Sequence, residues 1–290
     1  MPASAGKSEI RPCSLCGSLN FKHALECEEF SFVRCVSCGL VQRNPQPDKN
    51  EIIARYSSIY GNDYLSYELD NEAAFLKLQQ LALLDAGFAK LEKKLLTRAK
   101  DNDAPHISDT PHIIDVGCAT GALLNCLRDR GWRVTGVEIS PCAEYAKNER
   151  ALDVRNVPLE DNNFSAESFD AVLASHLIEH LNDPKVFLNE AYRLLKNGGR
   201  IFITTPNISG FQARLFGGRW RSAIFDHLYL FSERTLKKML KDAGFKIESC
   251  HTWGGLAAGT APLWLKRTVD FLVKRFNCGD VMIIKAKKII

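Results

Sequence analysis

The sequence has no apolar run long enough to form a membrane-spanning helix. Its first nine residues, Met-Pro-Ala-Ser-Ala-Gly-Lys-Ser-Glu, lack the apolar stretch of a secretion signal. Neither positive nor negative residues are in large excess. A net charge of +4 on 290 residues is too small to indicate a nucleic-acid partner by itself. A hydrophobic content of 46% is ordinary for a globular protein. We therefore expect a cytoplasmic protein.

Ten cysteines are present, and four of them form two Cys-x-x-Cys pairs, Cys13/Cys16 and Cys35/Cys38, with 18 residues between the pairs. Each pair is followed by glycine, which lets the chain turn so that backbone amides point at the sulfurs. This spacing is typical of a four-thiolate zinc site. Disulfides are disfavoured by the missing secretion signal and by the six other cysteines. A redox pair is disfavoured because no βαβ unit surrounds either motif.

The segment between the two pairs predicts a short hairpin from Phe21 to Val33, with its loop near Glu26–Glu29. With the cysteine pairs, this hairpin makes a zinc ribbon or double knuckle that we place in residues 1–48. Cys27 lies in the loop and is interpreted as a bystander.

The stretch Ile113-Ile-Asp-Val-Gly-Cys-Ala-Thr-Gly121 predicts a buried strand, a glycine turn and the start of a helix. Such a turn at the carboxyl edge of a parallel sheet is typical of a nucleotide-type site. Asp115, at the end of the strand, suits a ligand with an ammonium group. A second strand ends at Glu138, whose carboxylate can accept hydrogen bonds from both hydroxyls of a ribose.

Later motifs follow in order: residues 168–175, Ile178-Glu-His180 with Asp183-Pro184, and residues 190–207 with their glycine turn. With the first turn, they resemble the class I S-adenosylmethionine-dependent methyltransferases of the ubiquinone-methylase-like kind. The resemblance covers roughly residues 111–250. It implies an α/β fold with a seven-stranded, Rossmann-like doubly wound sheet whose final strand is antiparallel, preceded here by the small zinc ribbon.

The resemblance also implies a division of the chain. Residues 1–48 form the zinc-ribbon leader, residues 49–110 form a helical segment and linker over the cofactor mouth, and residues 111–290 form the methyltransferase domain. Tyr60, Tyr64 and Tyr67 either line that mouth or pack within the helical segment. We expect strands near 112–116, 133–138, 152–157, 169–174, 200–205, 246–251 and 280–287. We expect helices near 50–100, 120–130, 141–149, 184–195 and 233–243.

By the same resemblance, S-adenosyl-L-methionine is the cofactor. Its methionine part is held by Gly117, Gly121 and the backbone near Asp115, including Cys118. Its ribose is held by Glu138. The loop with Leu159 and Glu160 lies beside the adenine, and His176 is within reach of the cofactor carboxylate or the acceptor.

Three histidines are candidates for the general base, because an imidazole accepts a proton near neutrality. We rank His180 and His227 above His176, since their flanking residues resemble family segments on the acceptor side. The alternative for His180 is a hydrogen bond to the backbone that orders its loop. The alternative for His227 is a structural hydrogen bond.

Two further segments indicate the acceptor. The stretch from Phe211 to Arg221 contains Arg214, Arg219 and Arg221 beside aromatic residues, which suits a phosphate, carboxylate or sugar, or else forms a solvated loop with one anchoring tryptophan. Residues 263–276 are amphipathic and basic, which is typical of a helix that lies on a membrane surface or covers a sheet.

The cysteine-rich leader resembles the one that precedes many bacterial methyltransferases of glycan or secondary-metabolite pathways. The leading hypothesis is therefore methyl transfer to a small-molecule or glycan-type acceptor, including lipid- or nucleotide-linked ones, with residues 263–276 as the candidate for peripheral contact with the inner membrane face. One alternative is an RNA methyltransferase with a zinc leader, which the small net charge disfavours. The other is an inactive methyltransferase fold that serves as a zinc-ribbon interaction protein, which the intact glycine turn disfavours.

Overall fold

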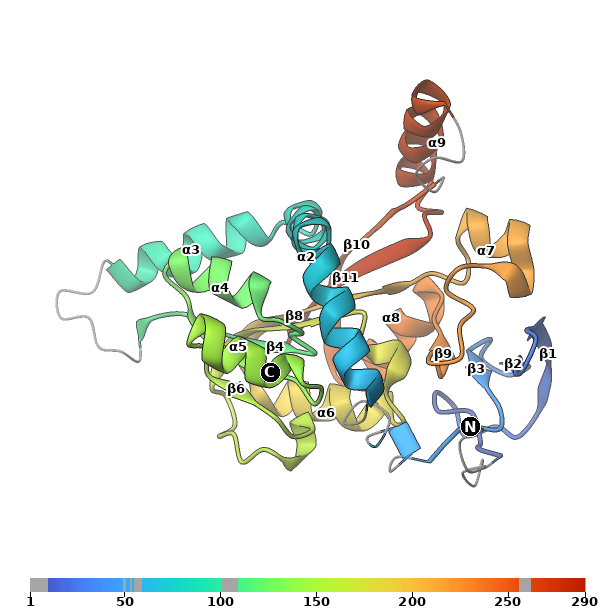
Figure 1. The fold of residues 1–290 in the computed structure, drawn as a ribbon, viewed down its shortest axis with the longest axis horizontal. Coiled ribbons are helices and arrows are strands. Elements are labelled where there is room, and N and C mark those ends of the chain that lie inside the picture. The colour runs from blue at the N-terminus through green and yellow to red at the C-terminus, as the bar shows by residue number, and fades with distance from the viewer. Residues whose placement is uncertain are drawn as a thin grey trace.

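The computed structural model describes residues 10–48, 51–52, 54, 59–100, 109–255 and 262–289. Its main sheet has seven strands in the order β10-β11-β8-β7-β4-β5-β6 (Figure 1). The strands are β4 (His112–Val116), β5 (Arg133–Val137), β6 (Val154–Arg155), β7 (Phe169–Ser175), β8 (Leu195–Pro206), β10 (Phe245–Trp253) and β11 (Val281–Lys288). Strands β4 to β8 pair in parallel, whereas β11 is antiparallel to both β8 and β10. The predicted fold class is confirmed.

Helices cover both faces of this sheet. They are α2 (Ile59–Asp85), α3 (Phe88–Lys100), α4 (Ala122–Asp129), α5 (Cys142–Arg150), α6 (Pro184–Leu194), α7 (Phe211–Phe216), α8 (Glu233–Asp242) and α9 (Leu263–Arg275). Apolar residues of α2, α3 and α4 pack on one face, and those of α6 and α8 pack on the other. None of the described helices is long and apolar enough to cross a bilayer.

The predicted helix over 50–100 is divided in the structure. It ends at Asp85 and restarts at Phe88, with Gly87 at a φ of 74° between the two parts. A left-handed residue in this position terminates a helix, because only glycine adopts it without a steric cost from Cβ. The resulting α2 runs across the sheet in Figure 1, and α3 turns back beside α4.

The helix α8 shows how local sequence sets its boundaries. Ser232 accepts a hydrogen bond from the backbone N–H of Thr235, and the Thr235 hydroxyl accepts one from the backbone N–H of Ser232. This reciprocal capping satisfies two amides at the helix start. The helix ends before Gly244, whose φ is 93°.

A second sheet of four strands contains the cysteine-rich leader. Its order is β1 (Phe21–Glu26), β2 (Ser31–Cys35), β3 (Val41–Arg43) and β9 (Tyr229–Leu230), all antiparallel. The β1–β2 pair is the predicted hairpin. Strand β9 comes about 190 residues later in the chain than β3 and lies beside it in Figure 1. Strand β9 was not predicted, because a strand of two residues carries no alternating pattern.

Packing joins the leader to the main domain as well. Leu15 and Leu40 are buried in the same hydrophobic cluster as residues of β4, β7, α6 and α8. The leader is therefore attached by a shared sheet and a shared core. Our division of the chain at residues 48 and 110 stays a prediction.

Candidate cofactor and acceptor site

The glycine turn follows β4 at the point where the order of the sheet reverses, between β4 and β7. Gly117 and Gly121 have φ values of 75° and 77°, a conformation that side chains disfavour. A Cβ on Gly121 would lie 2.5 Å from Leu152 Cδ1. Both positions of this loop therefore require glycine. The loop leads into the first turn of α4, which is where a doubly wound sheet is expected to bind a ligand.

Asp115 is the penultimate residue of β4 and has an unsatisfied carboxylate oxygen. Its side chain is buried, and Oδ1 has no hydrogen-bond partner among the described residues. Burial, together with the nearby charge of Glu138, raises the pKa of Asp115 to about 7. A buried carboxylate without a partner is costly, and an ammonium group would provide one. The site therefore fits the amino group of S-adenosylmethionine.

Glu138 follows β5 and is held in one orientation by the backbone. Its Oε2 accepts the N–H of Ala119 at 3.0 Å, and its Oε1 accepts the N–H of Ser140 at 2.8 Å. Each carboxylate oxygen still has a lone pair for a second donor. The side-chain amide of Asn156 donates a hydrogen bond to the backbone carbonyl of Glu138 at 2.8 Å. This geometry fits the two ribose hydroxyls predicted for Glu138.

Helix α2 is fastened across this site. Glu72 Oε1 accepts a hydrogen bond from Thr120 Oγ1 at 2.7 Å, and Arg150 Nη2 lies 2.5 Å from the same oxygen. Thr120 belongs to the glycine turn and Arg150 to α5. The helix is therefore tied to both elements that border the turn.

Two more residues of α2 approach the site one and two turns earlier. Burial raises the pKa of both Tyr64 and Glu68, and the charge of Glu138 adds to each shift. These residues and Glu72 recur at four-residue spacing on one face of α2. Glu68 and Glu72 were not predicted from the sequence. Their four-residue spacing from Tyr64 is the pattern that indicates them. Tyr67 is exposed beside Phe75, and the Tyr60 side chain lies outside the described residues.

The remaining cofactor candidates have different surroundings. A Cβ on Gly136 would lie 2.7 Å from Cys118 Sγ, so this thiol packs against β5 and only its backbone remains for a ligand. Leu159 and Glu160 lie in a short 3-10 helix, η2 (Leu159–Asp161), where Leu159 is buried and Glu160 is exposed. Their contact with an adenine ring stays a prediction.

On the other side of the turn, the three candidate histidines, His176, His180 and His227, surround a buried glutamate. Glu179 lies in η3 (Ile178–His180) with no exposed surface, and its Oε2 accepts the hydroxyl of Thr205 at 2.9 Å. His176 Nδ1 lies 3.3 Å from Oε1, without the alignment of a hydrogen bond. Burial alone would raise the pKa of Glu179, but the surrounding histidines lower it to about 2.

The rings of His180 and His227 meet edge to face, with centroids 4.6 Å apart. His180 Nδ1 lies 3.0 Å from the Asp226 carbonyl, and His227 Nδ1 lies 2.8 Å from the Ser222 carbonyl. These are the backbone hydrogen bonds weighed in the sequence analysis. Burial and the neighbouring His180 lower the pKa of His227 to about 4, so that ring is neutral at pH 7. The three candidate histidines therefore converge on Glu179.

The four predicted cysteines also converge. All their sulfurs lie within 4.8 Å of one another, with Cys13 and Cys38 at 3.4 Å and Cys16 and Cys35 at 3.5 Å. Ligands in a tetrahedron with zinc–sulfur bonds of about 2.3 Å lie about 3.8 Å apart, which these distances approach. Burial acts to raise the pKa of Cys35, but the backbone N–H of Cys38 and neighbouring groups lower it to about 6. Amides therefore point at this sulfur, as predicted.

Comparison with known proteins agrees with this geometry. A family model described as a methyltransferase domain matches residues 82–250, more than half of the chain. The chain belongs to this methyltransferase family. The cofactor class, S-adenosylmethionine, follows from that membership.

Curated relatives of this methyltransferase match only part of it. The mitochondrial ubiquinone biosynthesis O-methyltransferase of Rattus norvegicus is 33% identical over 150 residues, which cover 48% of this chain and 42% of the rat protein. The ubiquinone biosynthesis O-methyltransferase of Coxiella burnetii is 32% identical over 111 residues, covering 36% of this chain and 47% of that one. The chain thus spans less than half the length of these relatives.

Solved structures support the fold. A methyltransferase from Archaeoglobus fulgidus, described as dependent on S-adenosylmethionine, superposes with a TM-score of 0.51 at 19% identity, covering 77% of this chain and 99% of that one. At this identity the likeness concerns the fold alone.

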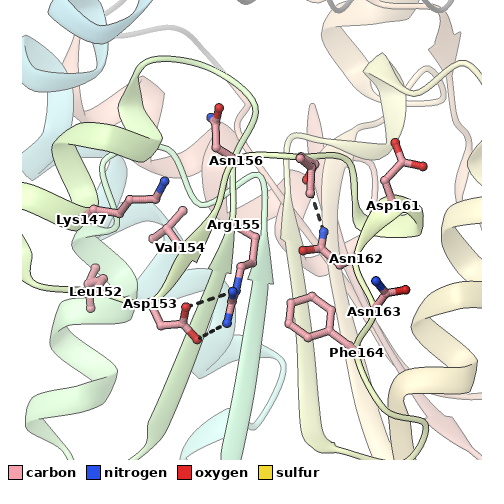
Figure 2. Close-up of a pocket in the computed structure, with 11 residues that line it drawn as sticks. Lys147, Leu152, Asp153, Val154, Arg155, Asn156, Asp161, Asn162, Asn163 and Phe164 are labelled. Atoms are coloured by element: carbon pink, nitrogen blue, oxygen red, sulfur yellow. Dashed lines mark hydrogen bonds and ion pairs between the residues drawn. The ribbon is translucent and has the colours of Figure 1, made fainter.

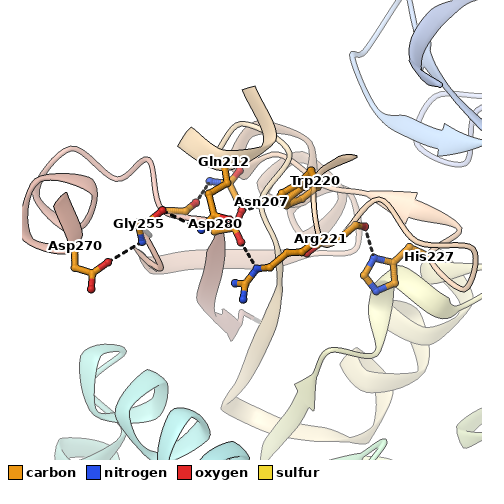
Figure 3. A network of polar contacts seen from close by, with 10 residues as sticks. Asn207, Gln212, Trp220, Arg221, His227, Gly255, Asp270 and Asp280 are labelled. Atoms are coloured by element: carbon orange, nitrogen blue, oxygen red, sulfur yellow. Dashed lines mark hydrogen bonds and ion pairs between the residues drawn. The ribbon is translucent and has the colours of Figure 1, made fainter. Parts of the chain in front are cut away.

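The predicted arginine segment of the methyltransferase is a short helix, α7, followed by a turn. Figure 3 shows the contacts that fix the turn: Trp220 Nε1 donates to Asp280 Oδ1, and Arg221 Nε lies 2.6 Å from Asp280 Oδ2. Asp280 is fully buried, so Arg221 compensates its charge and contributes to the fold. Arg214 and Arg219 are exposed and remain the candidates for acceptor contact.

The methyltransferase also has a groove of about 700 Å³ at the outer edge of the sheet, which Figure 2 shows between α5, β6 and the loop after it. Lys147, Arg155, Asn162 and Phe164 are among its lining residues. The glycine turn, Glu138 and the histidine group do not line it. It is therefore not the place where the cofactor-type residues converge.

Proposed function

We propose that this protein transfers a methyl group from S-adenosyl-L-methionine to a small-molecule acceptor with an ionisable hydroxyl. The observation that supports this proposal is the position of three groups at the carboxyl ends of neighbouring strands. They are Asp115, Glu138, and Glu179 with its surrounding histidines. The names of the ubiquinone O-methyltransferase relatives support an oxygen acceptor. Glycan-type acceptors, including lipid- or nucleotide-linked ones, belong to the same proposal because they carry hydroxyls and because Arg214 and Arg219 suit a phosphate.

The cofactor, when bound, supplies an electrophilic methyl group. The protein then has to align the acceptor oxygen and accept its proton. Because Nδ1 of His180 and of His227 faces a carbonyl, it carries the proton of each neutral ring, and Nε2 keeps a lone pair. We propose that these two nitrogens face the acceptor hydroxyl. His176 is closer to the cofactor side, since it interacts with Glu68 of α2.

The test is an assay with labelled S-adenosylmethionine against three acceptor sets: phenols and catechols, nucleotide or lipid-linked sugars, and total RNA. We expect methylation within the first two sets. His227→Ala should lower turnover by about 10²-fold, the scale of a positioned base, with unchanged affinity for S-adenosylhomocysteine. The matched control is His23→Ala, an exposed histidine of the leader. Methylation of RNA alone, or normal turnover in His227→Ala, would contradict this proposal.

We also propose that the four cysteines bind one structural zinc ion. The supporting observations are the sulfur distances and the two glycine turns, with Gly17 at a φ of 75° and Gly39 at 85°. The half-buried Cys27 lies outside the cluster, with its sulfur near the Gly218 and Ala223 carbonyls. Elemental analysis should find zinc at one ion per chain from this cluster. Its absence, together with oxidised thiols, would contradict the assignment.

Peripheral membrane contact through residues 263–276 is the last part of the proposal. Trp264 and Phe271 are 70% and 68% exposed at positions seven residues apart, which places them on one face of α9 together with Arg267 and Arg275. In Figure 1, α9 stands away from the main sheet. Such a face suits an anionic lipid surface.

Sedimentation with anionic vesicles tests the contact. Wild-type protein should bind these vesicles and should not bind neutral ones. A Trp264→Ser, Phe271→Ser variant should lose most of this binding. Leu215→Ser, which removes an apolar side chain of α7 that is 60% exposed, is the control. Equal sedimentation of all three proteins would exclude α9 as the contact.

A further inference from the structure

The outward face of α2, which points away from the main sheet, is apolar and is not covered by any described element. Five large side chains on it are between 38% and 60% exposed: Tyr67, Leu69, Leu78, Leu81 and Leu84. The inward face is apolar too, since Ala82 and Leu83 of the same helix pack into the core. A helix that is apolar on both sides is typical of one that is covered on both sides. We therefore expect the outward face to contact another chain.

Six exposed residues in the middle of this face form a pattern that is symmetric about its centre. In chain order they are a leucine, an aspartate, two alanines, a lysine and a leucine: Leu69, Asp70, Ala73, Ala74, Lys77 and Leu78. The midpoint between the two alanines is equally far from the two charged residues, and equally far from the two leucines. A second copy of α2, laid antiparallel about a two-fold axis through this midpoint, would place unlike charges opposite each other and leucine opposite leucine.

The two charges on this face have no partner within the described part of the chain. Neither Asp70 nor Lys77 forms an ion pair or a side-chain hydrogen bond with another described residue. They are seven residues apart, which separates them by about 10 Å along the helix axis, so they do not pair with each other. Across the two-fold axis each would meet the opposite charge of the partner. Small side chains at Ala73 and Ala74 would let the two helices approach closely where they cross.

We propose that this protein forms a two-fold symmetric dimer in which α2 of one protomer crosses α2 of its partner, antiparallel, at Ala73 and Ala74. A second copy of the chain accounts for the symmetry of the face, which an unrelated protein or a lipid surface does not require. Asp70 would also be repelled by an anionic membrane. Because Glu72, on the inward side of α2, contacts the glycine turn, the two cofactor sites would lie on opposite sides of the helix pair. Assembly is measured without turnover, so this inference succeeds or fails separately from the proposed reaction.

Sedimentation velocity of the full-length protein over a range of micromolar concentrations tests the dimer. The wild type should sediment as a dimer. Asp70→Lys and Lys77→Asp should each weaken dimerisation by about 100-fold or more, because each variant sets two pairs of like charges against each other. Lys94→Asp, which makes the same kind of charge change on the exposed side of α3, should leave the dimer intact.

The decisive result comes from combining the two changes. The double variant Asp70→Lys, Lys77→Asp should dimerise again, and an equimolar mixture of the two single variants should form a heterodimer. Both combinations restore unlike charges across the axis, and residues about 10 Å apart on one helix cannot produce this rescue within a chain.

Three results would overturn the proposal: a wild type that is monomeric at every concentration, undiminished dimerisation in the single variants, or a double variant or mixture that stays monomeric. Circular dichroism and S-adenosylhomocysteine affinity equal to those of the wild type show that each variant is folded.

Discussion

The two halves of the site are built in different ways. The cofactor half consists of residues that are close in sequence: Asp115 lies near the end of β4, Gly117 and Gly121 form the turn after it, and Glu138 follows the next strand. The acceptor half joins η3 to β9 and the leader, so that the Glu179 carbonyl accepts the N–H of Leu228, and the Leu228 carbonyl accepts that of Arg43. Local geometry thus determines the cofactor half, whereas the acceptor half depends on long-range packing. The two halves should respond differently to mutation.

The largest effect is expected within the cofactor half. Glu138→Ala removes the proposed acceptor for two ribose hydroxyls, and hydrogen bonds to a charged group contribute about 1.5–3 kcal/mol each. Affinity for S-adenosylhomocysteine should therefore fall by about 10²-fold or more. Calorimetry measures the loss, and Glu144→Ala, on the exposed side of α5, should show none. Unchanged affinity in a folded Glu138→Ala protein would remove this residue from the cofactor site.

Loss of the folded leader should disturb the acceptor half of the site and lower turnover. Cys38→Ser removes one of the four proposed zinc ligands, which should release β3 and therefore β9, the strand that follows His227. Misplacing a reacting group by about 1 Å costs about 10²-fold, so turnover should fall by this order. Affinity for S-adenosylhomocysteine should change by less than about threefold, since the glycine turn has its own packing.

The matched control for this variant is Cys27→Ser, which changes a half-buried cysteine outside the cluster. It should retain both zinc and turnover. Equal losses of cofactor affinity and turnover in Cys38→Ser would show that the two halves of the site are not independent.

A pH series tests Asp115. Its pKa of about 7 in the free protein means that the folded state binds an extra proton between the ordinary pKa near 4 and pH 7. Ionising this group therefore lowers stability as pH rises through that window. A bound ammonium group favours the carboxylate, so binding releases a proton below pH 7.

The affinity for S-adenosylhomocysteine should consequently rise with pH, by at most about tenfold per unit below pH 7, and level off above it. Calorimetry in buffers of different ionisation enthalpy measures the proton release directly. Asp115→Asn should bind more weakly, with a flat pH profile. A flat profile in the wild type would show that Asp115 does not meet the ammonium group.

This contrast also explains which features the sequence predicted. The strands from β4 to β8, the glycine turn and Glu138 are encoded by local patterns, and the structure places them as expected. The cluster of four cysteines was predicted because a four-thiolate zinc site requires Cys-x-x-Cys pairs at a characteristic spacing. Strand β9 and the hydrogen bond between Thr205 and Glu179 depend on tertiary packing. No local pattern indicates such contacts.

The smallest effect is expected where α2 is fastened over the cofactor half. Glu72 accepts the Thr120 hydroxyl at 2.7 Å and pairs with Arg150 at 2.5 Å. The side chains of Glu72 and Arg150 are 28% and 18% exposed, whereas Thr120 is buried. Partly exposed pairs contribute about 1 kcal/mol or less, so Glu72→Ala should speed S-adenosylhomocysteine dissociation only about three- to fivefold. Stopped-flow measurement of dissociation tests this expectation, with Asp70→Ala on the exposed face of α2 as the control. An unchanged rate in Glu72→Ala would mean that α2 does not restrict cofactor release. A loss as large as that of Glu138→Ala would mean instead that α2 is part of the binding surface itself.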